Sequence, residues 1–280
     1  MSSDKLLSYP KALCEQVKRL AVEAGDITLD YFDEGGVDSQ QKEDGSPVTL
    51  ADQHAEKVII KGLNEMTPSV PVVGEESMAA GKKPDISKSD YFWLVDPLDG
   101  TKEFISGSGD FTVNIALIFN GDPVLGVVYA PYHGLLYAGF GLGTATKWLE
   151  DTDIEKKILT RRAPVEGLTV VASKSHGKGE KLDKFLTDYK VKKLLKKGSS
   201  LKICAVAAGK ADIYPRFGPT CEWDTAAADA ILRAAGGVMT DTNGNPLVYG
   251  GRREGFLNPE FIAWSGDLAP ENAIATQDAQ

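Results

Sequence analysis

The chain has 280 residues, of which 42% are hydrophobic and 25% charged, and its formal net charge is −9 at pH 7. This length allows one large domain or two modest ones with a sizeable core, and the acidic balance argues against binding to a nucleic-acid polymer, which favours a basic footprint. A small anionic ligand would need a metal ion or a local basic patch to offset the protein's own charge.

Residues 1–147 are expected to form an α+β domain. Apolar residues recur at helical spacing over residues 10–32 and again over 55–66, which predicts two amphipathic helices, the first ended by Gly35-Gly36. Strands are predicted after them at residues 70–73, 91–95, 111–119, 123–130 and 135–140. Gly-containing turn sequences separate the last three strands and are typical of hairpins, so this sheet should be largely antiparallel.

Residues 148–280 are expected to form an α/β domain, because helices and strands alternate along this part of the chain. The predicted strands lie at 168–172, 191–195, 211–214, 237–240 and 261–264, and the predicted helices lie at 180–189, 199–208 and 225–235. The fold class predicted for the whole chain is therefore α/β, with an α+β N-terminal half.

The segment Asp96-Pro97-Leu98-Asp99-Gly100-Thr101 follows an apolar run that predicts a buried strand. Two carboxylates three residues apart at the end of such a strand need a site that compensates their charge. Gly100 permits close approach of the backbone to a ligand, and Thr101 can open a short helix. Carboxylates beside a helix start are the parts of a site for Mg²⁺ and phosphate, although an ordinary Asp-rich turn has the same pattern.

Two further acids extend this hypothesis. Glu75 follows the predicted strand at 70–73, and Asp224 is placed to cap the predicted helix at 225–235. Alone, the first could be a solvated loop acid and the second a helix cap. Together with Asp96 and Asp99 they favour a two-metal cluster, in which ions about 3.5–4 Å apart drive in-line phosphoryl displacement.

Three segments in this order resemble the signatures of one family: Gly74-Glu75-Glu76-Ser77, the segment at 96–101, and Trp223-Asp224-Thr225-Ala226-Ala227. The chain is thereby similar to the Mg²⁺-dependent, lithium-sensitive phosphatases of the inositol monophosphatase superfamily over almost its whole length. The segments at 102–105, 111–118 and 198–202 look most like the bacterial-type 3′(2′),5′-bisphosphate nucleotidase branch, which hydrolyses adenosine 3′,5′-bisphosphate to AMP and phosphate. The resemblance implies a layered α/β/α/β/α sandwich with the metals between its halves.

The same resemblance implies two or three Mg²⁺ ions. The ligands of the first would be Glu75, Asp96 and the Leu98 carbonyl, and those of the second would be Asp96, Asp99 and Asp224. The first ion would lower the pKa of an attacking water, and the second would stabilise the leaving 3′ oxygen. Hydrolysis would then need no covalent enzyme intermediate, and inhibition by Li⁺ is implied by family membership alone.

The remaining catalytic roles are implied in the same way. Thr101, oriented by Glu75 or Asp52, would position the attacking water, and the N–H groups of Gly100 and Thr101 would cradle the phosphate. Asp52 also fits a helix capping box that begins at Thr49, and this role is compatible with catalysis.

Cations would select the substrate. Lys202 and Arg216 are expected to hold the nucleotide or its second phosphate together with Ser199, because the nucleotidase branch has matching residues there and Arg can grip a phosphate with two donors. His176 matches a nucleotide-contacting His of that branch. Without the resemblance, surface solubility would explain each Lys or Arg, and a lone His is more often structural.

Three functions remain open at this point. The first is a bisphosphate nucleotidase with a small-molecule nucleotide substrate. The second is an inositol monophosphatase or inositol polyphosphate 1-phosphatase. A small monophosphate has no second phosphate that would need Ser199, Lys202 and Arg216, and this feature separates the inositol monophosphatase from the nucleotidase. The third is a non-catalytic protein that senses metal or nucleotide, against which the presence of all expected ligands argues.

Cys14, Cys204 and Cys221 are odd in number and lack CxxC spacing, which favours reduced thiols. The N-terminus lacks the apolar core of a signal peptide, and no apolar run approaches the length of a membrane span, so we expect a cytoplasmic protein without a membrane partner. The sequence leaves open whether the chain forms a homodimer.

Overall fold

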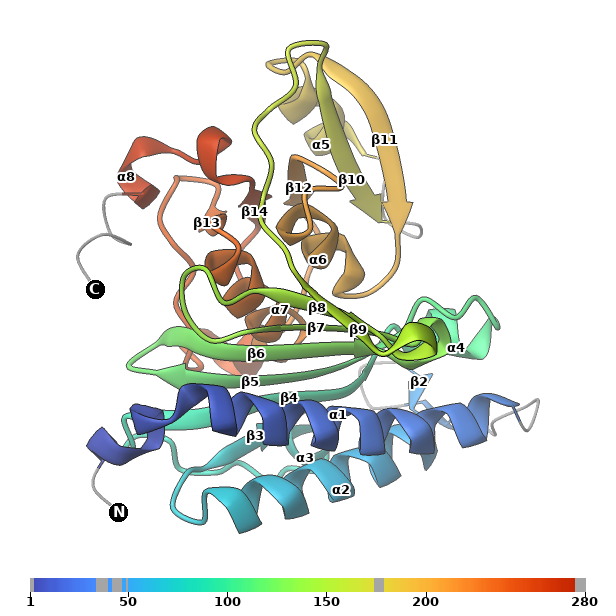
Figure 1. Cartoon of the computed structure of the whole chain (residues 1–280), viewed down its shortest axis with the longest axis vertical. Helices are drawn as coiled ribbons and strands as arrows, with labels where there is room; N and C mark the ends of the chain where they lie inside the picture. Colours follow the sequence, from blue (N-terminus) through green and yellow to red (C-terminus); the bar gives the residue numbers. More distant parts are fainter. Residues whose placement is uncertain (1–2, 34–39, 42–46, 49, 174–178, 275–280) are drawn as a thin grey trace.

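The structure is a computed structural model that describes residues 3–33, 40–41, 47–48, 50–173 and 179–274. Helices and sheets alternate in layers (Figure 1). Helices α1 and α2 cover one face of a large sheet, α6 and α7 lie between that sheet and a smaller one, and α5 and α8 lie on the outer side of the smaller sheet. The expected α/β/α/β/α sandwich is confirmed.

Helices α1 (Pro10–Asp33) and α2 (Leu50–Met66) follow from the helical spacing of their apolar residues. Val17 of α1 and Ile59 of α2 are fully buried in one core cluster with strands of the large sheet. The predicted helices are therefore found, although α2 begins earlier than residue 55. The predicted stop at Gly35-Gly36 lies outside the described residues.

The large sheet has seven strands in the order β3-β4-β5-β6-β7-β8-β9, and of these pairs only β3 and β4 run parallel, as the largely antiparallel prediction requires. Strand β4 is buried from Tyr91 to Leu98 because helices cover both faces of the sheet. The strands are β3 (Val72–Gly74), β4 (Tyr91–Asp99), β5 (Thr112–Phe119), β6 (Asp122–Ala130), β7 (Leu135–Gly139), β8 (Thr146–Leu149) and β9 (Ile154–Lys157), and a separate short pair is β1 (Gln40–Gln41) with β2 (Pro47–Val48).

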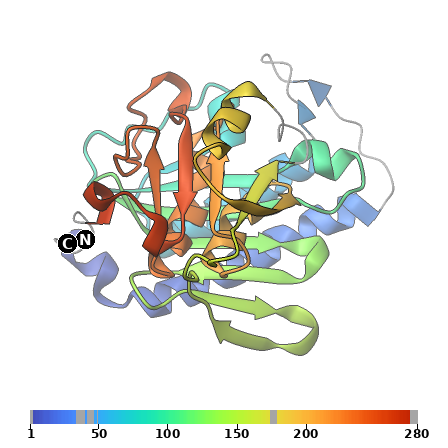
Figure 2. The ribbon, with the colours of Figure 1, turned by 90° about the horizontal axis from the view of Figure 1, so that it is seen from above.

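The last two strands of the large sheet, β8 and β9, were not among the strands predicted from the sequence. They form a hairpin that extends beyond the smaller sheet when the molecule is seen from above (Figure 2). All four residues of β9 are exposed, so the alternation of buried and exposed side chains that marks a strand is missing there. The predicted domain boundary at residue 147 therefore falls inside β8, and the large sheet continues to Lys157.

The smaller sheet has the order β11-β10-β12-β14-β13 and mixes parallel with antiparallel pairs. Its strands are β10 (Leu168–Ser173), β11 (Val191–Lys197), β12 (Ile213–Arg216), β13 (Val238–Asp241) and β14 (Phe261–Trp264), and the helices of this half are α5 (Glu180–Leu186), α6 (Leu201–Ala207), α7 (Glu222–Ala234) and α8 (Glu271–Ile274). The alternation predicted for this half is confirmed, with α5 and α6 shorter than expected.

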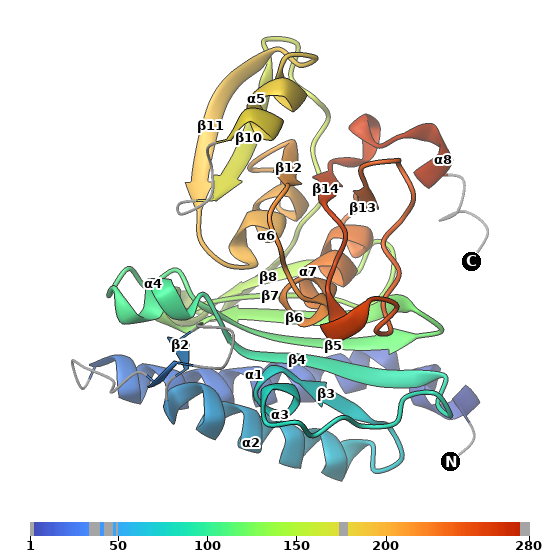
Figure 3. The same cartoon turned by 180° about the vertical axis from the view of Figure 1, so that it is seen from behind.

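Helix α7 lies close against the large sheet because a glycine of β6 leaves room for it. A Cβ on Gly126 would collide with the main-chain oxygen of Ala227. This close approach brings α7, which belongs to the second half of the chain, into contact with strand β4 of the large sheet (Figure 3). Among the described residues, no helix combines the length and apolar character that crossing a membrane requires.

Candidate active site

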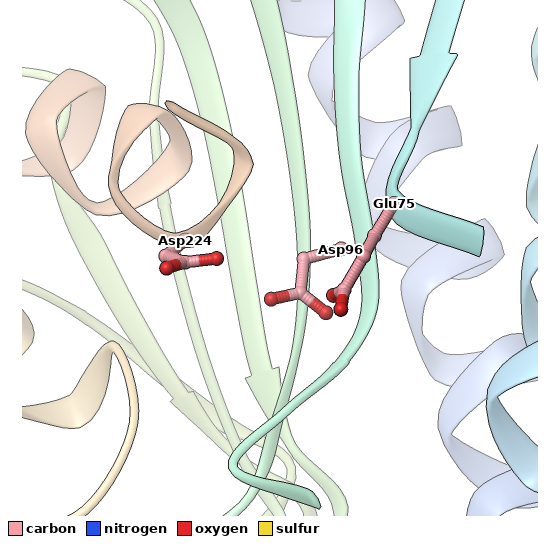
Figure 4. A group of neighbouring side chains, drawn as sticks. All are labelled: Glu75, Asp96 and Asp224. Carbon is pink, nitrogen blue, oxygen red and sulfur yellow. The ribbon is translucent and has the colours of Figure 1, made fainter. Parts of the chain in front are cut away.

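Three carboxylates from distant parts of the chain meet between the layers. Glu75 opens the short helix α3 (Glu75–Ala79), Asp96 lies in β4, and Asp224 lies in the first turn of α7. One oxygen from each carboxylate lies within 4.8 Å of the other two. Figure 4 shows Asp96 between Glu75 and Asp224. Such a cluster of oxygen ligands suits a hard cation such as Mg²⁺.

The position of Glu75 depends on Glu56, a buried acid that the sequence patterns did not reveal. The side chain of Glu56, on α2, accepts hydrogen bonds from the main-chain N–H groups of Glu76 (2.9 Å) and Ser77 (3.3 Å) and from the Ser77 hydroxyl (2.8 Å). N–H groups at a helix start have no partner inside the helix, so Glu56 supplies one. It thereby fixes the turn from β3 into α3 on which Glu75 sits.

The end of β4 is shaped for two carboxylates. Asp96 pairs with Asn114 and Asp99 with Thr112, so the register shifts and the strand bulges between these two acids. The Leu98 N–H donates to Asp96 Oδ1 (3.0 Å), which holds the Asp96 carboxylate toward the cluster.

Gly100 and Thr101 follow this bulge. Gly100 has φ +95°, and a Cβ there would lie 2.9 Å from the main-chain oxygen of Asp110. A glycine is therefore required before helix α4 (Thr101–Ile105). The Thr101 hydroxyl donates to the Leu98 carbonyl (3.3 Å), the same oxygen that was expected to face a metal ion.

The predicted capping role of Asp224 needs a correction. Cys221 occupies the N-cap of α7, and Asp224 stands three residues later, where its Oδ2 accepts the Cys221 N–H (2.9 Å). This capping box leaves the second carboxylate oxygen for the cluster. The helix begins at Glu222, before the predicted start at 225, because the box closes its first turn.

The electrostatics of the cluster favour a bound cation. Burial raises the pKa of Asp96 well above its usual range, and the neighbouring carboxylates of Glu75, Asp99 and Asp224 raise it further. Burial and then Asp99 raise the pKa of Asp224 in the same direction. Without a cation these groups are disfavoured as anions, so a divalent ion would relieve both desolvation and repulsion.

Asp99 lies beside this trio and has other partners. Its Oδ2 accepts the Ser200 hydroxyl (2.9 Å), and burial raises its pKa while Lys202 and Ser200 oppose the rise. Three of the four acids predicted as ligands therefore form the cluster, and Asp99 lies beside them on the side that faces Lys202.

A cavity of about 770 Å³ opens beside the cluster. Residues of both halves line it, and the lining includes most of those singled out in the sequence, namely Glu75, Asp99, Gly100, Thr101, Ser199, Lys202, Arg216 and Asp224. Asp96 and Leu98 lie behind this lining, both almost fully buried. One chamber therefore adjoins the acidic cluster and two cations.

The two cations are held differently. Lys202 Nζ lies 5.8 Å from the centre of the Tyr214 ring, and burial lowers its pKa while Asp99 opposes the change. The Arg216 guanidinium donates to the Pro219 carbonyl (3.1 Å), and its buried Nε has no hydrogen-bond partner among the described residues. An anionic ligand in the cavity would satisfy this donor.

Ser199 shows a similar lack of a partner. It has φ +42°, a strained conformation for a residue other than glycine, and its buried Oγ has no partner in the described part of the chain. Strain and an unsatisfied hydroxyl at one cavity-lining residue point to a ligand contact.

Asp52 and His176 complete the set of predicted site residues. Asp52 is buried in the first turn of α2, and it is not one of the three acids whose oxygens cluster. His176 lies outside the described residues. The sequence reasoning also missed Ser200, whose hydroxyl donates to Asp99, and Asn114, whose amide donates to Ser200, because buried polar partners leave no periodic signal.

A model of the inositol monophosphatase family matches residues 11–269. The chain belongs to this family. The 3′(2′),5′-bisphosphate nucleotidase CysQ of Escherichia coli is 45% identical over 252 residues, which cover 89% of this chain and 98% of that protein. The protein of the same name from Salmonella typhimurium is 46% identical over an equal length.

Solved structures agree. CysQ from Bacteroides thetaiotaomicron superimposes with a TM-score of 0.77 at 38% identity, covering 93% of this chain and 99% of that one. The inositol monophosphatase from Anabaena has a TM-score of 0.72 at 24% identity, covering 96% and 95%, and supports the fold alone.

Proposed function

We propose that the chain is a Mg²⁺-dependent 3′(2′),5′-bisphosphate nucleotidase, which hydrolyses adenosine 3′,5′-bisphosphate to AMP and phosphate. One observation carries this proposal: the acidic cluster and the cations Lys202 and Arg216 border the same cavity of about 770 Å³. A monoester with one phosphate needs the cluster only, whereas a bisphosphate also needs cations for its second phosphate. Relatives at 45% and 46% identity that carry this name support the choice.

We expect the site to hold two or three Mg²⁺ ions. Glu75, Asp96 and the Leu98 carbonyl would hold one, Asp96, Asp99 and Asp224 would hold another, and all of these donors are the oxygens that Mg²⁺ prefers. The raised pKa values of Asp96 and Asp224 support cation binding, because ionised carboxylates are costly there without one. Bound ions would supply a water of lowered pKa and stabilise charge on the phosphate.

The residues of the chain orient the reactants around that chemistry. Thr101 would position the attacking water through its hydroxyl, aided by Glu75 or Asp52. The N–H groups of Gly100 and Thr101, at the start of α4, have no partner inside the helix and would hold the phosphate. Ser199, Lys202, Arg216 and His176 would hold the nucleotide and its other phosphate.

A direct test is phosphate release from adenosine 3′,5′-bisphosphate by the purified chain, with AMP identified by chromatography. We expect release that requires Mg²⁺, stops with EDTA and is inhibited by Li⁺. Tight binding of the nucleotide without release would instead favour a non-catalytic sensor.

All three cysteines are free thiols, which is consistent with a cytoplasmic location. Sedimentation analysis will measure whether the chain dimerises.

A further inference from the structure

A single hydroxyl connects both halves of the chain at the acidic cluster. Ser200 Oγ lies 2.8 Å from Asn114 Nδ2, 2.9 Å from Asp99 Oδ2 and 2.9 Å from the main-chain oxygen of Asp224. These partners belong to β5, β4 and α7, while Ser200 stands at the residue before the first turn of α6. Ser200 and Asn114 are 2% and 1% exposed, so water competes little for these bonds.

The chemistry of the groups sets the direction of the bonds. The Asn114 amide donates to Ser200 Oγ and therefore occupies one of its lone pairs. The Ser200 proton then goes to Asp99 Oδ2 or to the Asp224 carbonyl, and the charged carboxylate is the stronger acceptor. The result is a chain of donors from Asn114 through Ser200 to Asp99, in which each bond polarises the next.

We infer that Ser200, supported by Asn114, is a positioning residue that fixes the Asp99 carboxylate for cation binding. With Oδ2 engaged by Ser200, Oδ1 is the oxygen of Asp99 that remains to be offered to a cation. Ser200 Oγ also lies 2.9 Å from the Asp224 carbonyl, so the first turn of α7 packs against the same hydroxyl and the relative positions of Asp99 and Asp224 depend on one side chain. The inference rests on the proposed function only in assuming that the cluster binds Mg²⁺.

The first experiment measures Mg²⁺ affinity by calorimetry, without substrate, for wild type, Ser200→Ala, Asn114→Ala and the double variant. Losing a group that orients a metal ligand typically costs 10–100-fold in metal affinity, so we expect about tenfold or more for Ser200→Ala. Because Asn114 acts through Ser200, the double variant should bind Mg²⁺ no more weakly than Ser200→Ala alone. Additive losses, or wild-type affinity in Ser200→Ala, would overturn the inference.

A matched control separates positioning from stability. Ser265 is also a fully buried serine, and its Oγ donates to the Asp267 carboxylate (3.3 Å) away from the cavity lining. Ser265→Ala should leave Mg²⁺ affinity unchanged even if it lowers the melting temperature of the metal-free protein. An equal loss of Mg²⁺ affinity in both variants would show a general effect of removing a buried hydroxyl and would contradict the inference.

Kinetics then distinguish positioning from substrate contact, since Ser200 also borders the cavity. A positioning role predicts that Ser200→Ala needs more Mg²⁺ for half-maximal rate, with KM for the nucleotide at saturating Mg²⁺ within about twofold of wild type. A raised KM with unchanged Mg²⁺ affinity would mean that Ser200 contacts substrate instead. If wild type itself binds no Mg²⁺, the proposed function fails, which is a separate result.

Discussion

Asp96 and Asp224 lie on opposite halves of the chain, one in a strand of the large sheet and the other in α7, yet oxygens of their carboxylates lie within 4.8 Å of each other. Neither half alone contains the complete cluster. Packing of α7 on the large sheet therefore builds the site, and the stability of that packing and the binding of metal should depend on each other.

The first prediction concerns pH and metal. The folded-state pKa values of Asp96 and Asp224 are raised by burial, so the stability they contribute is present below about pH 4, the unfolded value, and is lost as pH rises through the folded values. Mg²⁺ binds the ionised form and should reverse this loss. We expect saturating Mg²⁺ to raise the melting temperature on the order of 5 °C at pH 8 and clearly less at pH 5.

Differential scanning calorimetry with and without Mg²⁺ measures this difference. The variant Asp96→Asn removes one of the titrating groups and should show a smaller shift at pH 8. A shift in the wild type that is equal at both pH values would contradict the account of the cluster.

The second prediction is that Asp99→Asn abolishes turnover while the protein stays folded. Burial already disfavours the Asp99 charge, so a neutral side chain of the same size should not destabilise the metal-free protein. Loss of metal-derived charge stabilisation should cost several kcal/mol in the transition state, on the order of a thousandfold in kcat. Near-normal phosphate release at saturating Mg²⁺ would remove Asp99 from the proposed ligand set.

The third prediction separates chemistry from substrate choice. The double variant Lys202→Ala/Arg216→Ala should lose about a hundredfold or more in kcat/KM for adenosine 3′,5′-bisphosphate, because hydrogen bonds to charged groups contribute about 1.5–3 kcal/mol each. Inositol 1-phosphate hydrolysis should change far less, since neither cation belongs to the metal cluster. Equal losses for both substrates would contradict the nucleotide assignment.

The control for this pair removes the same charge elsewhere. Arg19 and Lys193 are exposed on α1 and β11 and do not line the cavity. The variant Arg19→Ala/Lys193→Ala should keep wild-type activity toward both substrates if the effect of Lys202 and Arg216 is local.

The fourth prediction tests how the layers are held. Gly126→Ala places a methyl group against the Ala227 main-chain oxygen, and relief requires α7 to shift from the sheet. We expect a loss of about 1–3 kcal/mol in the free energy of unfolding and weaker Mg²⁺ binding through displacement of Asp224. Gly179→Ala, which meets no atom within 4 Å, is the control and should change neither.

The sequence patterns indicated the acids that the structure brings together, whereas the residues that hold these acids in place gave no pattern. Asp96, Asp99 and Glu75 could be found because each follows an apolar run that predicts a buried strand, where a carboxylate demands compensation. Their convergence with Asp224 depends on long-range packing that no local pattern encodes. The sequence indicated Asp224 as the helix cap, and its actual position, three residues after the N-cap Cys221, became visible only with the fold.

Other features left no readable signal for physical reasons. Helix α3 has five residues, too few to show helical spacing, and β9 is exposed on both faces. Glu56 and Asn114 are buried polar residues whose partners lie far away in the sequence, so their hydrogen bonds cannot be inferred from their neighbours.

The central claim is that the cavity selects a bisphosphate nucleotide. A comparison of the hydrolysis rates of two substrates tests it most directly. Purified protein is given adenosine 3′,5′-bisphosphate or inositol 1-phosphate at equal, saturating Mg²⁺, and kcat/KM is measured for each. Because Lys202 and Arg216 would each form a charge-assisted hydrogen bond with the bisphosphate only, the account predicts a preference for it on the order of a hundredfold or more. An equal or higher kcat/KM for inositol 1-phosphate would contradict the claim.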